Sequence, residues 1–259
     1  MCSGSSGNST YIGVSESHGV LIDVGRSTKQ IESLLKQNNI DVNTIKAIFI
    51  THEHIDHVSG VRVFAKKYGV KVYGSEGTIN ALISKGIIPE NSEYEVLYNQ
   101  KVDLNFMSVK PFYTSHDCSQ GMGYVIENAE GRKSAICTDL GYISEDVKTS
   151  VTGCESVLIE SNHDVMMLQN GPYPYYLKRR ILSEKGHLSN DTCSEFLPQL
   201  VNSGAKNIVL SHLSEKNNIP ELARQTAIYN LDKNSMKENV DFSLSIAPKL
   251  NDNSVNVLF

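Results

Sequence analysis

The chain has 259 residues, a formal net charge of −5 at pH 7, 40% hydrophobic residues and 20% charged residues. This length is enough to bury a sizeable core, and the composition is ordinary for a globular protein. No stretch approaches the ~18 apolar residues that cross a bilayer, and the start of the chain lacks the basic region and apolar core of a signal peptide. The negative charge argues against a generally basic nucleic-acid-binding surface, although a local basic patch would be enough to meet a phosphate.

The cysteines indicate a reducing environment. There are five, an odd number, and they are widely spaced without a CxxC pair. Such a pattern does not form a disulfide framework, so we expect a cytoplasmic protein. The cysteines are Cys2, Cys118, Cys137, Cys154 and Cys193.

The first part of the chain alternates strands and helices. Apolar runs and period-two alternation predict strands, and an apolar face at helical spacing predicts each helix. The predicted strands are 8–14, 20–25, 47–50 and 71–73. The predicted helices are 29–37, 58–67 and 78–84.

The second part is richer in strands. We predict strands at 93–97, 102–104, 106–113, 123–127, 134–138, 156–160, 207–210, 242–246 and 255–258. Helices are predicted at 144–149, around 175–183, at 190–202 and at 220–231. There is no internal repeat and no clear boundary, so we expect one domain over residues 1–259. Strands with helices interspersed between them indicate an α+β or layered α/β fold.

A histidine-rich loop is the clearest functional signal. Three histidines and an aspartate fall within six residues, directly after the apolar run 47–50. These residues are His52, His54, Asp56 and His57. A solvated loop or an expression tag could also be rich in histidine, but a tag does not interleave acids between a strand and a helix. The spacing therefore predicts a metal site.

Further candidate ligands occur one at a time, each just past a predicted strand. They are His116, Asp139 and His212. Strand ends are where a rigid scaffold holds functional side chains while its loops vary. A site for two metals needs about six or seven nitrogen and oxygen ligands with a position for water, and these residues supply that number.

The ordered pattern HxHxDH, lone histidine, lone aspartate and final histidine resembles the metallo-β-lactamase fold superfamily. The resemblance implies a four-layer αβ/βα sandwich, an α+β fold. It implies that one metal is bound by His52, His54 and His116. A second would be bound by Asp56, His57 and His212, with Asp139 bridging the two. Asp23 matches the aspartate that supports the histidine loop through hydrogen bonds in that superfamily.

Three other stretches resemble the bacterial YycJ family, also called WalJ or VicX. They are SGSSGN at residues 3–8, ESNHD at 160–164, and a YP…R segment that runs into GHLSN at 186–190. The resemblance implies a metal-dependent nuclease that uses a metal-bridging hydroxide and acts on DNA as a 5′→3′ exonuclease. The cofactors would be two divalent ions, zinc or manganese or iron, since the ligands are histidine and carboxylate without thiolate.

Several residues are candidates for substrate chemistry. Asp56 and His187 are the predicted catalytic residues, with His187 contacting phosphate and protonating the leaving group. Arg180 is the first choice for a phosphate clamp. Ser189 and Asn190 could cap the helix at 190–202, whose N-terminus is a place for a phosphate. A structural role for His187 at that helix start is the alternative reading, and His163 could be structural or could support the site.

Three functions compete. The first is a phosphodiesterase or nuclease with a nucleic-acid substrate, DNA before RNA. The second is a thioester or lactone hydrolase of the glyoxalase II type, against which the segment with Arg180 and His187 counts. The third is a non-catalytic regulator, which a complete ligand set disfavours. The trailing His57 disfavours β-lactam hydrolysis, because many β-lactamases lack it.

Overall fold

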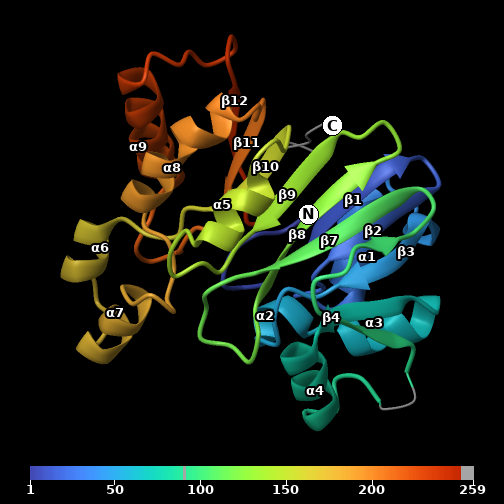
Figure 1. Ribbon diagram of the computed structural model, residues 1–259. Coiled ribbons are helices and arrows are strands. Elements are labelled where there is room, and N and C mark those ends of the chain that lie inside the picture. The colour runs from blue at the N-terminus through green and yellow to red at the C-terminus, as the bar shows by residue number, and fades with distance from the viewer. Residues whose placement is uncertain (90–91, 252–259) are drawn as a thin grey trace. The chain divides into compact units, whose positions relative to one another are not determined.

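The computed structural model describes residues 1–89 and 92–251 (Figure 1). The chain divides into two compact units. The first consists of Met1–Pro111, Cys118–Met122 and residues 248–251, and the second of Phe112–Asp117 and Gly123–Ala247. The strand predicted at 255–258 lies outside the described residues, and the assignment of the whole chain to one domain stays a prediction.

The first unit contains a five-stranded sheet. Its strands, in spatial order, are β1 (Thr10–Ser15), β2 (His18–Ile22), β3 (Ile45–Phe49), β4 (Lys71–Ser75) and β5 (Tyr94–Leu97). The β1–β2 pair is antiparallel and the other pairs are parallel. The helical segments are α1 (Thr28–Gln37), η1 (Val42–Thr44), α2 (Ile55–Val58), α3 (Val61–Tyr68) and α4 (Glu76–Ser84).

The core of this unit lies between the sheet and the apolar faces of α1, α3 and α4. Parallel strands are near-continuous in apolar residues because such sheets are covered. Members of the core include Leu21, Ile48 and Val72 from strands, and Ile31, Leu35, Val61, Phe64, Ile79 and Leu82 from helices.

The single helix predicted over 58–67 is wrong at its start, since the chain forms α2 and α3 there. Gly60 separates them: its N–H donates to the carbonyl of Val24 at 2.9 Å. A Cβ at this position would lie 2.0 Å from the carbonyl oxygen of Arg26. The backbone approach that only glycine permits thus fixes the end of the histidine loop.

A second sheet has seven strands in the order β12-β11-β10-β9-β8-β7-β6. Their bounds are β6 (Val102–Asp103), β7 (Met107–Tyr113), β8 (Met122–Asn128), β9 (Lys133–Cys137), β10 (Ser156–Glu160), β11 (Asn207–Ser211) and β12 (Ser243–Ile246). Strands β9 to β12 are parallel, whereas β8 pairs with β9 in the antiparallel sense. The chain passes from the first unit to the second within β7.

The helices of the second unit are α5 (Glu145–Val151), α6 (Val165–Asn170), α7 (Tyr175–Ile181), α8 (Asn190–Asn202) and α9 (Pro220–Lys233). Figure 1 shows α8 and α9 beside β10 to β12, where their apolar residues join the core of this unit. Helix α6 was not predicted. It is short, and Asp164 caps its start: the Asp164 carboxylate accepts from the backbone N–H of Met167 at 2.7 Å.

Parallel pairing brings functional residues of the second unit to one sheet edge. Glu160, at the end of β10, is in register with Ser211 at the end of β11, and Ile159 is in register with Cys137 at the end of β9. The residues that follow these strands therefore emerge together, as is usual for sites at the carboxyl ends of parallel strands.

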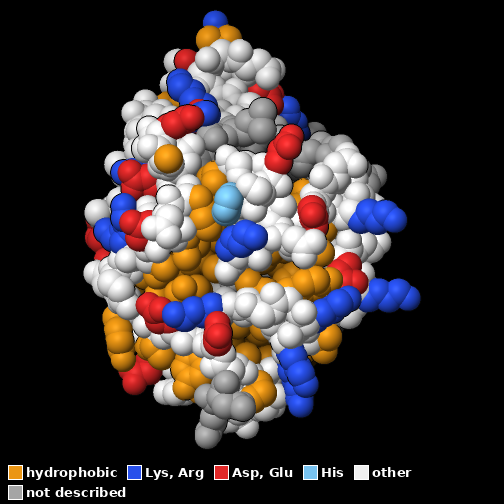
Figure 2. Space-filling model, turned by 90° about the vertical axis from the view of Figure 1, so that its right-hand side faces the viewer, with side chains coloured by type: hydrophobic (Ala, Val, Ile, Leu, Met, Phe, Trp, Pro, Cys, Tyr) orange, Lys and Arg blue, Asp and Glu red, His pale blue; other side chains and the backbone are white. Residues whose placement is uncertain are grey.

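Basic and acidic side chains are interspersed over the face shown in Figure 2. This distribution agrees with the modest net charge of the chain, −5. Among the described residues, no helix has both the length and the apolar character needed to cross a membrane.

Candidate metal centre

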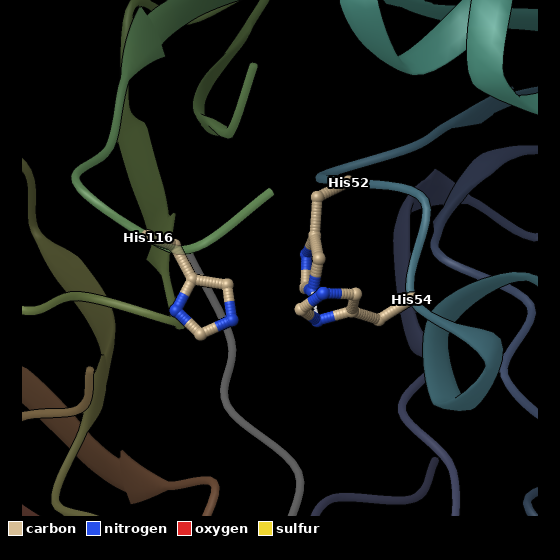
Figure 3. A group of neighbouring side chains, drawn as sticks. All are labelled: His52, His54 and His116. Carbon is tan, nitrogen blue, oxygen red and sulfur yellow. Dashed lines mark hydrogen bonds between the residues drawn. The ribbon is translucent and has the colours of Figure 1, made fainter. Parts of the chain in front are cut away.

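The loop after β3 brings two of the predicted ligands together. His52 Nε2 and His54 Nδ1 lie 2.9 Å apart, as the dashed line in Figure 3 shows, while His116 in the same view follows β7. His52 is buried. Alternate residues of an extended segment point to the same side, which explains why this HxH spacing lets two imidazoles converge.

Asp23 orients the third histidine of this loop. His57 Nδ1 lies 2.7 Å from Asp23 Oδ2, so with Nδ1 donating, Nε2 keeps its lone pair. Asp23 also accepts from the backbone N–H and the hydroxyl of Thr51, both at 2.8 Å. Burial raises the pKa of the Asp23 carboxyl, and these hydrogen bonds oppose that shift. The predicted supporting role of Asp23 requires such hydrogen bonds, and that role stays a prediction.

Asp56 lies beside His57, with its Oδ2 3.6 Å from His57 Nε2. Asn8, which the sequence analysis did not single out, approaches both residues. Its Nδ2 is 3.3 Å from Asp56 Oδ2 and 3.0 Å from His57 Nε2. The signal for Asn8 was present in the glycine- and serine-rich turn at residues 3–8, where Asn8 Oδ1 accepts from Gly4 N–H at 2.8 Å.

In the second unit, imidazole nitrogens surround the Asp139 carboxylate. Asp139 Oδ1 is 3.5 Å from His212 Nδ1, 3.7 Å from His116 Nε2 and 3.7 Å from His187 Nδ1. His116 Nδ1 lies 3.0 Å from the carbonyl oxygen of Gly186, so with Nδ1 donating, Nε2 keeps its lone pair. Burial lowers the pKa of His116, which keeps the ring neutral and able to ligate a metal.

Glu160 is the functional residue that sequence reasoning missed, although the ESNHD stretch contains it. It is fully buried, and its Oε1 lies 2.8 Å from His187 Nδ1 and 2.7 Å from His212 Nδ1. Burial alone would raise the pKa of Glu160, but the charge and hydrogen bonds of the two histidines outweigh it and lower the pKa to about 2. One carboxylate thus orients two imidazoles.

The backbone at three predicted site residues adopts the left-handed region that L-residues avoid. The φ angles are 62° at Asp23, 58° at Asp139 and 57° at His212. Such conformations cost free energy and cluster at sites where the side-chain direction matters. Each of these residues lies one or two positions after the end of a strand. The unusual φ therefore sets the direction of its side chain at the edge of the sheet.

The residues fit divalent metal ions. Asp139, Glu160, His187 and His212 each offer a ligand atom, and these atoms all lie within 4.8 Å of one another. Imidazole with carboxylate and without thiolate suits zinc, manganese or iron. The chain therefore holds a residue cluster able to bind metal.

The predicted substrate residues differ in their surroundings. Arg180 forms an ion pair with Asp117, and 54% of its side chain is exposed. Ser189 caps α8 by accepting from the backbone N–H of Thr192. Asn190 is buried, and its side chain exchanges hydrogen bonds with Ser161 and Asn218. This geometry favours a structural role for Asn190, and its role in phosphate binding stays a prediction.

His163 is buried, and among the described residues neither of its ring nitrogens has a hydrogen-bond partner. Burial lowers its pKa to about 4. A neutral, enclosed imidazole fits the structural role that was one of its two predicted readings.

Comparison with known proteins identifies the family. The metallo-beta-lactamase superfamily model matches residues 3–212. Exodeoxyribonuclease YycJ of Bacillus anthracis is 39% identical over 227 residues, covering 87% of this chain and 85% of that protein. The chain belongs to the YycJ/WalJ family of the metallo-β-lactamase superfamily. Exodeoxyribonuclease WalJ of Streptococcus pneumoniae is 38% identical over 247 residues, covering 94% of this chain and 91% of that protein.

The fold of this YycJ/WalJ family member also matches a solved structure. The metallo-beta-lactamase fold protein YhfI from Bacillus subtilis aligns with a TM-score of 0.68 at 14% identity, covering 96% of this chain and 95% of that chain. The predicted family and the α+β metallo-β-lactamase fold are thus confirmed. Family membership agrees with the predicted enzyme class, a metal-dependent hydrolase.

Proposed function

We propose that this protein is a dinuclear-metal phosphodiesterase that degrades DNA as a 5′→3′ exonuclease. One observation carries the proposal: His187, with 21% of its side chain exposed, is held by fully buried Glu160 beside Asp139. The group that would donate the proton thus lies beside Asp139, one of the proposed metal ligands. The names of the two relatives, both exodeoxyribonucleases, support DNA as the substrate.

The proposed ligand set is the one the family resemblance implies. It consists of His52, His54, Asp56, His57, His116, Asp139 and His212. Two divalent ions, zinc or manganese or iron, would supply an activated water and neutralise charge on the phosphoryl group when bound. The superfamily match spans residues of both compact units, which supports the assignment of the chain to one domain.

The protein residues position groups and move protons. Glu160 accepts from His187 Nδ1, which leaves Nε2 as the ring nitrogen that would protonate the leaving oxygen. Burial would lower the pKa of His187, but Glu160 and Asp139 raise it above its usual value. The ring therefore holds a proton at neutral pH more readily than a free imidazole does.

Asp56 is the second proposed catalytic residue. Its carboxylate adjoins His57 Nε2 and is reached by Asn8 Nδ2, which fixes its direction. Arg180 and Ser189 are the proposed phosphate contacts. Arg180 would have to exchange its bond to Asp117 for a bond to phosphate, since a guanidinium prefers a bidentate oxyanion partner.

A substrate panel tests the proposal. Single- and double-stranded DNA and RNA, each with a 5′-phosphate or a 5′-hydroxyl, would be digested with zinc, manganese or iron, alongside bis(p-nitrophenyl) phosphate. We expect hydrolysis of the small diester and release of nucleotides from the 5′ end of DNA. Turnover of S-lactoylglutathione without any phosphodiester hydrolysis would reject the proposal in favour of a thioester hydrolase.

A further inference from the structure

Helix α7 exposes two consecutive tyrosines. The exposed fraction is 75% for Tyr175 and 74% for Tyr176. Two other large apolar side chains of the same segment are also exposed, Met166 at 63% and Leu182 at 45%. Two adjacent exposed aromatic side chains on one helix are candidates for contact with a partner.

The same segment is basic in a chain that is acidic. Residues 165–183 contain three basic residues and no acidic one, whereas the chain as a whole has a net charge of −5. The basic residues are Lys178, Arg179 and Arg180. Arg179 places its guanidinium 6.0 Å from the centre of the Tyr175 ring, within reach of a cation–π contact. Cations interleaved with exposed rings are the arrangement that binds single-stranded nucleic acid.

Helix α7 is held firmly. Lys178 Nζ donates to the carbonyl oxygen of Gln169 at 2.8 Å, which ties α7 to α6, and Figure 1 shows the two helices as neighbours. The carbonyl of Ile181 accepts from the backbone N–H of His187 at 3.0 Å. The tyrosines are therefore presented by a helix that is hydrogen-bonded to the segments before and after it.

The helix also leads directly to the proposed catalytic histidine. Ile181 lies six positions after Tyr175, which corresponds to about 9 Å along a helix. Arg180, on the same helix, pairs with Asp117, the neighbour of His116. The tyrosines and His187 thus belong to one continuous stretch of the chain, in which His187 follows the end of α7 at Ile181.

We propose that Tyr175, Tyr176 and Arg179 form a platform for single-stranded DNA, on which unpaired bases stack. Consecutive helical residues point about 100° apart, so the two rings would serve different bases. Stacking needs an exposed base face, which duplex DNA offers only at its ends. The inference rests on the proposed nuclease function and specifies its substrate as a single strand, or a duplex with a single-stranded end.

Kinetics of the metal-loaded enzyme test the platform. In the double variant Tyr175→Ala/Tyr176→Ala we expect KM for a single-stranded oligonucleotide to rise roughly 25-fold or more, at about 5-fold or more for each lost stack. Hydrolysis of bis(p-nitrophenyl) phosphate should not change, because that substrate carries neither a base nor a nucleic-acid backbone to lie on the platform. The Tyr175→Phe/Tyr176→Phe variant keeps both rings and should keep KM.

Tyr229→Ala is the matched control, since Tyr229 lies on α9 and is 69% exposed. It should leave KM for DNA unchanged. Arg179→Gln should reduce the slope of log KM against log salt concentration by about 0.7, the value for one phosphate contact on a single strand. Equal effects of the Tyr229 and Tyr175/Tyr176 variants would reject a specific platform.

The remaining outcomes separate this inference from the proposed function. Normal diester hydrolysis with unchanged KM for DNA in the double variant would overturn the platform alone. If the wild-type protein hydrolyses no phosphodiester, the proposed function fails, and fluorescence anisotropy with a labelled oligonucleotide then decides the platform separately. Binding to phosphatidylglycerol vesicles that the double variant loses, with DNA affinity intact, would assign the surface to membranes and overturn the platform.

Discussion

The two compact units supply their candidate ligands in opposite ways. The first unit carries four of them within the six residues from His52 to His57, on one loop after β3. The second draws His116, Asp139 and His212 from three separate stretches, and both histidines lie beside the Asp139 carboxylate. A contiguous loop can be recognised from spacing, whereas a dispersed set depends on the register of parallel strands. Substitutions in the loop and in the dispersed set should therefore differ in their effects on activity, metal binding and stability.

The largest expected effect is the loss of a proposed ligand from either arrangement. Asp139→Asn and His57→Ala should each reduce kcat/KM on bis(p-nitrophenyl) phosphate by roughly 10³-fold or more, since several kcal/mol of charge stabilisation depend on bound metal. Metal content, measured by elemental analysis, should fall as well. Full activity with full metal content in either variant would exclude that residue from the ligand set.

The second unit also contains His163, a buried histidine whose pKa is strongly lowered. His163 has a folded-state pKa of about 4, below the ordinary value of 6.5. As pH falls, the unfolded chain therefore binds the proton first. The contribution of neutral His163 to the free energy of unfolding is fully present above pH 6.5 and is lost as pH falls toward 4. The loss attributable to His163 is about 3 kcal/mol.

Denaturant unfolding at several pH values measures this contribution of His163 to the free energy of unfolding. His163→Gln should flatten the dependence of the unfolding free energy on pH between 6.5 and 4, whatever its effect at neutral pH. A variant with the same slope as the wild type would show that His163 is not the group responsible. Tyr229→Ala serves as a control that should keep the slope.

Each arrangement also depends on a glycine with no room for a side chain. A Cβ at Gly25 would lie 1.7 Å from the carbonyl oxygen of Asp56, and one at Gly141 would lie 1.9 Å from that of Glu184. We expect Gly25→Ala and Gly141→Ala to cost about 1–3 kcal/mol each as local overpacking.

Gly74→Ala is the control for both, because its Cβ would make only ordinary contacts at 3.5 Å. Thermal melts compare the three variants. If Gly25→Ala loses activity while Gly141→Ala loses only stability, the loop is the less tolerant arrangement. Equal melting temperatures for all three variants would contradict the close approaches.

The smallest expected effect is the difference in metal affinity between variants of the two supporting carboxylates, Asp23 and Glu160. Asp23 orients one histidine, His57, whereas Glu160 orients two. Removal of such a partner costs about 10–100-fold in metal affinity or activity. The loss of metal affinity should be near the upper end of this range for Glu160→Gln and near the lower end for Asp23→Asn. Competition with a chelator measures both affinities, and the reverse order would show that the number of oriented histidines does not set the effect.

The sequence by itself determined the histidine loop, the positions of most elements and the family resemblance. HxHxDH is local in the chain, and its geometry follows from an extended segment turning into a helix. Helix α8 was predicted with its observed bounds because apolar periodicity and its end signals are also local. The break at Gly60 was not predicted, because it depends on the distant carbonyls of Val24 and Arg26.

Only the tertiary structure showed which residues the side chains of Glu160, Asn8 and Asn190 contact. Glu160 looks like the last residue of a strand, yet the register of β10 with β11 places it against His212. Asn190 looks like part of a phosphate-binding helix start, but packing encloses its side chain among Ser161 and Asn218. The physical reason is the same in each case. A residue's partner across a sheet or a buried network is set by chain segments far away in sequence, and spacing along the chain carries no record of them.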